Sequence, residues 1–200
     1  MTPEDRPKQT ESAPDQARSS RSRARAIPAP TSAALAAARL AEEAIRSVDR
    51  EIVVAFNLAG REILRKTGMA DHVDLEPAEV RLLRDAVITH NHLTGFVDTF
   101  WVADVRVAAL ARASEVRVVT PTTTLVLRPP QSGWSHDWAE RTFVPAWERE
   151  RRQLISEMRG RIRRGEASHD EANRILHHEC WNRVAWRLGM QYGRDEERTQ

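Results

Sequence analysis

The sequence predicts an α/β (α+β) protein, in which a mixed β-sheet core with flanking helices lies between a disordered N-terminal tail and a C-terminal helical hairpin. Segments with helical spacing of apolar residues alternate with short β-branched segments over residues 31–130. Arg- and Glu-rich segments with helical spacing follow over residues 131–200, and residues 1–30 hold few large apolar side chains. We therefore expect a tail, a core domain and a helical extension with these bounds.

The composition narrows the class of protein. An apolar fraction of 40% with six Trp indicates a folded centre, and a formal charge of +2 does not indicate nucleic-acid binding by the whole surface. No segment approaches the roughly 20 consecutive apolar residues of a membrane span, and the N-terminus lacks the apolar core of a signal peptide. With Cys180 as the single cysteine, we expect a cytoplasmic protein without a membrane partner, whose metal sites would use His and carboxylate ligands.

The tail carries a local basic cluster. This cluster consists of Arg18, Arg21, Arg23 and Arg25 in a segment rich in Ser and Ala. A disordered arm of this kind could make a weak contact with nucleic acid or an acidic partner. A solvated linker is the simpler interpretation, because disordered segments commonly carry charge.

The expected core begins with a helix at Thr31, in a segment of strong helix formers with Ser32 as the N-cap. Residues 51–56 and 61–65 flank a turn that ends at Gly60 and predict a β-hairpin. The side of the first helix predicted to be buried carries Leu35, Leu40, Ile45 and Val48.

Further elements follow along the chain. We expect a short helix from Pro77, a buried strand over residues 86–90, a helix over residues 100–113 and a strand pair around Pro121.

The C-terminal extension is predicted to be a helical hairpin. Its first helix ends at Gly165. Its second begins at Ser168, with Glu171 completing a capping box, and runs to Gly189.

The motif most informative about function is His90-Asn91-His92, which ends an apolar segment. Side chains alternate along a strand, so the two imidazoles share one face and can converge on one ion, while Asn91 points away. Neutral imidazole is among the commonest zinc ligands. The motif predicts half of a zinc site, although a chain with seven His could also hold such a pair by chance.

Two carboxylates are the candidates that complete this site. Asp104 is the expected third ligand, because the loop containing Gly95 turns the chain back and Asp104 lies in the first turns of the next helix. A catalytic site also needs an acid/base that takes a proton from water and delivers it to a leaving amine. Glu51, which opens the first strand, is the candidate for this role.

The order of these elements resembles the JAB/MPN (JAMM) metallopeptidase-like domain, including its RadC-like and phage-type branches. The resemblance covers residues 51–128 and is most specific at the His-x-His motif followed by Asp104. It implies that His90, His92 and Asp104 bind Zn²⁺ and that Glu51 moves protons. The implied activity is hydrolysis of peptide or isopeptide bonds in a peptide or protein substrate.

The chain also departs from the family pattern. Leu93 replaces a Pro, and Trp101 replaces a Ser whose hydroxyl helps to stabilise the tetrahedral intermediate. Loss of such a donor can cost about two to three orders of magnitude in rate. Glu43 and Glu62 compete with Glu51 as the base. The nearest other hydroxyl groups are those of Ser114 and Thr94.

These observations leave three functions open. The first is a zinc-dependent hydrolase of the JAMM type. The second is a JAB-like binding or assembly protein with impaired catalysis, which Trp101 favours. The third is a RadC-like, DNA-associated accessory factor, which the basic tail favours.

Overall fold

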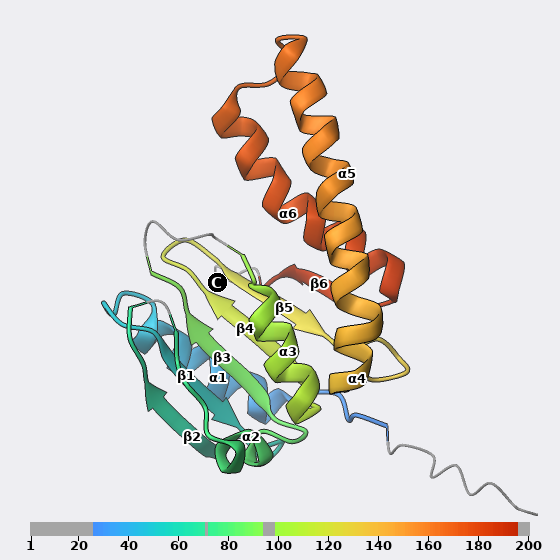
Figure 1. Cartoon of the computed structure of the whole chain (residues 1–200). Helices are drawn as coiled ribbons and strands as arrows, with labels where there is room; N and C mark the ends of the chain where they lie inside the picture. Colours follow the sequence, from blue (N-terminus) through green and yellow to red (C-terminus); the bar gives the residue numbers. More distant parts are fainter. Residues whose placement is uncertain (1–25, 71, 94–98, 196–200) are drawn as a thin grey trace, which may run out of the picture.

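The structure is a computed structural model that describes residues 26–70, 72–93 and 99–195 (Figure 1). It confirms the mixed α/β fold with a C-terminal helical hairpin. Within the described residues, the sheet has six strands in the order β2-β1-β3-β4-β5-β6, and only the β3–β4 pair is parallel. The strands are β1 (Ile52–Phe56), β2 (Glu62–Thr67), β3 (Val87–Asn91), β4 (Glu115–Val119), β5 (Thr124–Arg128) and β6 (Gln191–Arg194).

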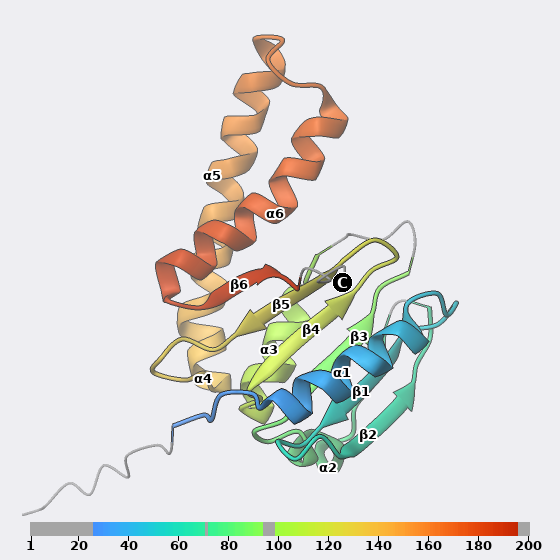
Figure 2. The same cartoon turned by 180° about the vertical axis from the view of Figure 1, so that it is seen from behind.

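Helices cover both faces of the sheet. Figure 2 shows α1 across one face, while α3 and the C-terminal helices lie on the other (Figures 1 and 2). Strand alternation divides the apolar residues between two clusters, with Val53 and Ile88 toward α3 and Val54 and Phe56 toward α1. The helices are α1 (Ser32–Ile45), α2 (Pro77–Leu82), α3 (Val102–Ala111), α4 (His136–Trp138), the π-helix η1 (Ala139–Phe143), α5 (Val144–Arg163) and α6 (His169–Leu188). Among the described residues, none of these helices has the length and apolar character required to cross a bilayer.

Helix α1 differs from the sequence prediction in two respects. Its N-cap is Thr31 rather than Ser32, because the Thr31 hydroxyl accepts a hydrogen bond from the Ala34 N–H at 3.2 Å. Leu40, predicted to be buried, is 78% exposed. Ile45 is buried as predicted, and the rest of the buried side carries Ala34, Ala38, Ala41 and Glu42. Small side chains let the helix approach the sheet closely, so the Ala stripe rather than the larger Leu faces the core.

The N-terminal and C-terminal segments contact the core. The tail prediction for residues 1–25, including the basic cluster, lies outside the described residues, whereas Ile27 packs against the main apolar cluster. The helical hairpin is confirmed with Ser168 and Glu171 forming the capping box and Gly189 ending α6 at a positive φ of 67°. Trp181 of α6 is buried in the same cluster as the sheet residues.

Strand β6 was missed by the sequence analysis. Its four residues have no alternating apolar pattern, and they form a strand because the chain returns after α6 to pair with β5. This pairing places the C-terminal extension in the sheet. The predicted division of the chain at residue 130 into a core domain and a helical extension stays a prediction.

A buried charge network joins α1, the sheet and the end of β6. The Arg117 side chain is 1% exposed and donates to both carboxylate oxygens of Glu42 at 2.5 and 3.2 Å. It also donates to Glu115 at 2.6 Å and to Asp195. Arg39 adds two hydrogen bonds to Asp195 at 3.0 and 2.9 Å. These ion pairs offset the free-energy cost of burying the charged Arg117 guanidinium.

Replacing Asp195 with Asn is expected to destabilise the protein at neutral pH and to matter less as the pH falls. Burial opposes the charge of this carboxylate, but hydrogen bonds from Arg39 and Arg117 outweigh it and lower the pKa from 3.8 to about 2. Such a group adds stability that is complete above the unfolded-state pKa of 3.8 and is lost as the pH falls toward 2. Urea unfolding of both proteins from about pH 7 to about pH 3 measures the difference. A difference that stayed constant over this range would contradict the prediction.

Candidate metal centre

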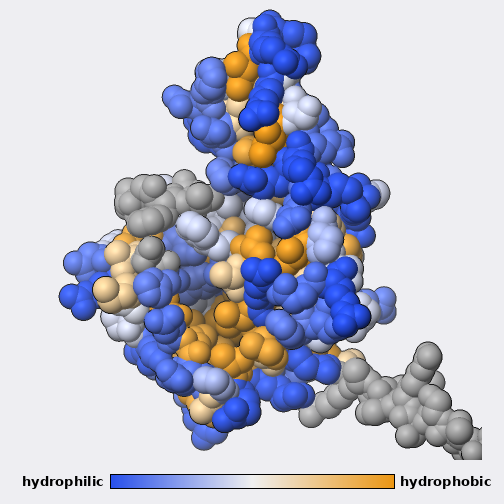
Figure 3. All heavy atoms as spheres, viewed as in Figure 1, coloured by the Kyte–Doolittle hydropathy of each residue, from blue (hydrophilic) through white to orange (hydrophobic). Residues whose placement is uncertain are grey.

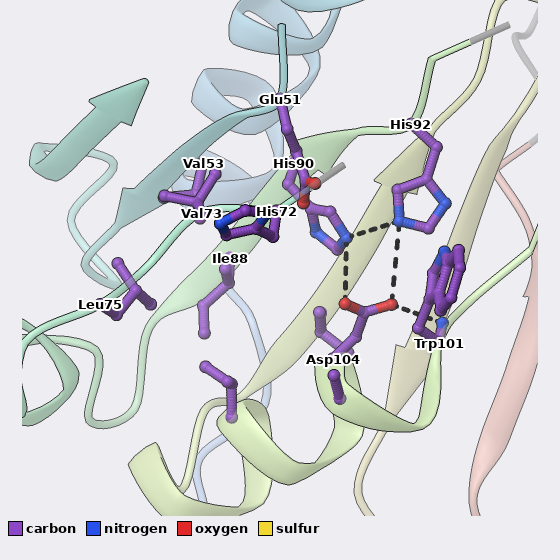
Figure 4. A pocket seen from close by; sticks show the side chains of 13 residues that line it. Glu51, Val53, His72, Val73, Leu75, Ile88, His90, His92, Trp101 and Asp104 are labelled. Carbon is purple, nitrogen blue, oxygen red and sulfur yellow. Dashed lines mark hydrogen bonds and ion pairs between the residues drawn. The ribbon is translucent and has the colours of Figure 1, made fainter. Parts of the chain in front are cut away.

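Strand β3 delivers both histidines to the α3 side of the sheet. His90 lies in β3 and His92 directly follows it, so alternation directs both imidazoles toward the same pocket (Figure 4). Each side chain is 7% exposed. Their Nε2 atoms lie 3.1 Å apart. Two imidazole nitrogens this close require a proton or a metal ion between them, because their lone pairs would otherwise repel.

Asp104 meets the histidines from the first turn of α3. Its Oδ1 lies 3.3 Å from His90 Nε2 and its Oδ2 lies 3.9 Å from His92 Nε2. The backbone N–H of Trp101 at the helix N-cap donates to Oδ2 at 2.6 Å. This bond orients the carboxylate while satisfying an otherwise unpaired N–H at the helix start.

Glu51 approaches from the residue before β1. One ligand atom from each of Glu51, His90 and His92 lies within 4.8 Å of the others. The Glu51 N–H donates to Met69 O at 2.9 Å, which holds its backbone beside the end of β2. The sequence-predicted residues of the site therefore come together in one place.

Asn91 holds the segment that carries Glu51, a role that sequence analysis missed. Its side chain is on the opposite face from the histidines and accepts the Ile52 N–H at 2.7 Å. Its amide donates to Arg50 O at 2.9 Å and Val48 O at 3.3 Å. The sequence held one signal for this role. An Asn in the middle of a His-x-His motif on an apolar strand is expected to be buried, and a buried amide needs hydrogen-bond partners.

His90 and Asp104 shift each other's pKa in opposite directions. Burial opposes the charged form of His90, but the carboxylate of Asp104, with a smaller contribution from Glu51, raises the pKa of His90 above its usual value. Burial likewise opposes the charge of Asp104, and His90 and His92 outweigh it, so the pKa of Asp104 lies below its usual value. Both shifts are those of a buried ion pair, in which a protonated His90 or a bound cation would balance the charge of the Asp104 carboxylate.

The separations between the ligand atoms lie near those of a tetrahedral zinc site, except that His92 Nε2 and Asp104 Oδ2 are 3.9 Å apart. Zinc binds nitrogen and oxygen at about 2.0–2.2 Å, which places two ligands of a tetrahedron about 3.3–3.5 Å apart. The separations from His90 Nε2 to His92 Nε2 and to Asp104 Oδ1 are 3.1 and 3.3 Å. A site with three protein ligands would leave one position open, as in catalytic zinc sites.

The competing acidic and hydroxyl groups lie elsewhere. Glu43 on α1 pairs with Arg46, and Glu62 on β2 pairs with Arg65. Neither lines the pocket. Ser114 donates to a backbone carbonyl at 2.8 Å at the opposite end of the sheet, and Thr94 lies outside the described residues.

The pocket around the cluster has mostly apolar walls. It has a volume of about 170 Å³. Trp101 stands at its rim, 46% exposed, with its ring edge-on to His92 at 6.3 Å between centroids. His72 also lines it, which sequence analysis did not predict. The apolar lining consists of Val53, Val73, Leu75, Ile88, Ala103, Val107 and Val116.

No protein-family model, curated protein or solved structure matches this chain. The resemblance to the JAB/MPN domain therefore rests on the order of the sequence elements and stays a prediction.

Proposed function

We propose that this chain is a zinc-dependent hydrolase of the JAMM type that cleaves peptide or isopeptide bonds. The observation that carries the proposal is the convergence of His90, His92 and Asp104 at distances that suit zinc, with Glu51 beside them. A pocket that is open to solvent and lined by apolar side chains would exclude water around a substrate chain. The single, buried Cys180 fits a cytoplasmic location.

Each polar residue would have a distinct task. A bound zinc ion would polarise the substrate carbonyl and acidify the attacking water. Glu51 would take the proton from that water and deliver it to the leaving amine. Asn91 would keep Glu51 in reach by fixing the backbone on either side of it. The Trp101 N–H would keep the Asp104 carboxylate turned toward the histidines.

Replacing Glu51 with Gln is expected to abolish hydrolysis while zinc stays bound. The amide has nearly the shape of the carboxylate but cannot accept the proton from water. Zinc content and cleavage should be measured together on a panel of peptide and isopeptide substrates. Glu62→Gln is the matched control, because Glu62 lies on the neighbouring strand β2 and pairs with Arg65 outside the pocket. Full activity in Glu51→Gln would contradict the assignment of the base.

Trp101 favours a second function, a JAB-like binding or assembly protein that has lost efficient catalysis. Its side chain cannot supply the hydroxyl found in the family, and it fills the rim of the pocket. Trp101→Ser places a hydroxyl at the N-cap of α3, where Ser is a favourable residue. The hydrolase proposal expects this variant to be more active than the wild type. No cleavage by the wild type or by this variant, with zinc present in both, would favour the binding protein.

A further inference from the structure

Three cavities follow one another from the metal centre to the helical hairpin. The metal-site pocket shares Trp101 and Ala103 with a second cavity of about 280 Å³ that extends to α5 and α6. This second cavity shares Leu176 with a third, of about 520 Å³, between the two helices of the hairpin. Figure 3 shows apolar side chains over the front of the sheet and again along the hairpin where α5 and α6 meet. We call the second and third cavities together the hairpin groove.

The floor of the hairpin groove is apolar and incompletely packed. Ile155, Met158 and Ile162 line it from successive turns of α5, and Leu176 lines it from α6. Ile155 is half-buried and does not pack against the main apolar cluster. At the end nearer the metal centre, the Trp147 Nε1–H is buried and has no hydrogen-bond partner within the described residues. An apolar surface that is incompletely packed suits a ligand with apolar side chains.

The rim of the groove is basic. Arg151, Arg159 and Arg163 line it from α5 and, among the residues that the structure describes, form no ion pair. Other arginines of the hairpin do have acidic partners, such as Arg152 with Glu148. Arg161 and Arg174 also form no ion pair among the described residues, but only Arg151, Arg159 and Arg163 line the groove. The Arg151 guanidinium lies over the Trp147 ring, 5.6 Å from its centroid. The positive charge beside the apolar floor favours an acidic ligand.

We propose that the hairpin groove binds an amphipathic, acidic helix of a partner protein. Two antiparallel helices with an apolar groove between them accommodate a third helix whose apolar residues recur every three or four positions. Acidic residues beside that stripe would pair with Arg151, Arg159 and Arg163. The chain's own basic cluster at Arg18–Arg25 has the wrong charge for this rim, and a second copy of the hairpin would bring arginine against arginine. The further statement that this partner is also the substrate rests on the proposed function. In that case, the part of the partner chain next to the bound helix would extend to the metal centre.

The test measures binding of a defined peptide to the full chain. The probe is a fluorescent amphipathic peptide of about 20 residues, with Leu along one helical face and Glu on the other positions. Fluorescence anisotropy is expected to show binding that weakens with salt. Combined Arg159→Glu and Arg163→Glu substitutions should weaken it about tenfold or more, and Ile155→Ser should also weaken it. Arg152→Glu, the same change on an α5 arginine outside the groove, should leave binding unchanged.

Three results would overturn the proposal. The first is no binding of the Glu peptide to the folded wild type. The second is a loss of charge specificity, shown by equal binding of a matched peptide with Lys in place of Glu or by equal weakening by Arg152→Glu. The third is self-association of the wild type that Ile155→Ser abolishes, which would show that a second copy covers the groove. Circular dichroism confirms that each variant is folded. Zinc content in the same samples separates failure of this proposal from failure of the metal site.

Discussion

Replacing His90, His92 or Asp104 with Ala is expected to reduce zinc from about one ion per chain to a trace. Each substitution removes one of three protein ligands and leaves the other two unable to hold the ion tightly. The measurement is metal analysis of each purified variant after dialysis against a weak chelator. His136→Ala is the matched control, because His136 is exposed on α4 and lies outside the pocket.

The three ligand variants distinguish between two possible ligand sets. The structure groups Glu51 with the two histidines within 4.8 Å, so Glu51 is an alternative third ligand. If zinc is retained in Asp104→Ala but lost in Glu51→Gln and in both histidine variants, Glu51 is the third ligand and Asp104 is not. Unchanged zinc content in the variants of His90, His92 and Asp104 would rule out the metal site.

Replacing Arg117 with Met is expected to lower the free energy of unfolding by about 3–5 kcal/mol. The substitution keeps the bulk of the side chain but leaves the carboxylate of Glu42, which is 3% exposed, without its cation. Glu115, which is 0% exposed, keeps Arg128 as its remaining cation. Asp195 loses one of its two guanidinium partners in the same step. Urea unfolding at neutral pH measures the change.

A matched exposed pair provides the control for the buried network. Arg106 on α3 pairs with Glu140 at 2.7 Å, and both side chains are substantially exposed. Arg106→Met should have a much smaller effect, because water solvates the carboxylate that remains. A loss in Arg117→Met no larger than in this control would show that the network does not stabilise the fold.

Local periodicity was sufficient to predict much of the site. The His-x-His spacing places two imidazoles on one face of any strand, because side chains alternate regardless of what the strand packs against. The capping box at Ser168 and Glu171 was predicted for the same reason, since its hydrogen bonds join residues only three apart. Elements defined by such short-range geometry were found within a few residues of their expected bounds.

Other features were decided by contacts between distant segments. Both Leu40 and the Ala stripe of α1 satisfy helical spacing, and only the closeness of the sheet selects the smaller residues for the buried side. Strand β6 depends on a neighbouring edge at β5 that its own four residues do not encode. Arg117 and Asp195 are separated by 78 residues, so no local pattern predicts their pairing.

The candidate site combines both kinds of information. The chemistry of His90 and His92 follows from the sequence, since residue type and strand alternation suffice to pair them. Their approach to Asp104 and Glu51 is a tertiary result, because it requires α3 to pack on the sheet and Asn91 to hold the backbone before β1. The hairpin groove is tertiary too, since α5 and α6 each present an apolar side but only their packing leaves part of it uncovered. Short-range rules thus assign chemistry to residues, whereas long-range packing determines which of them meet.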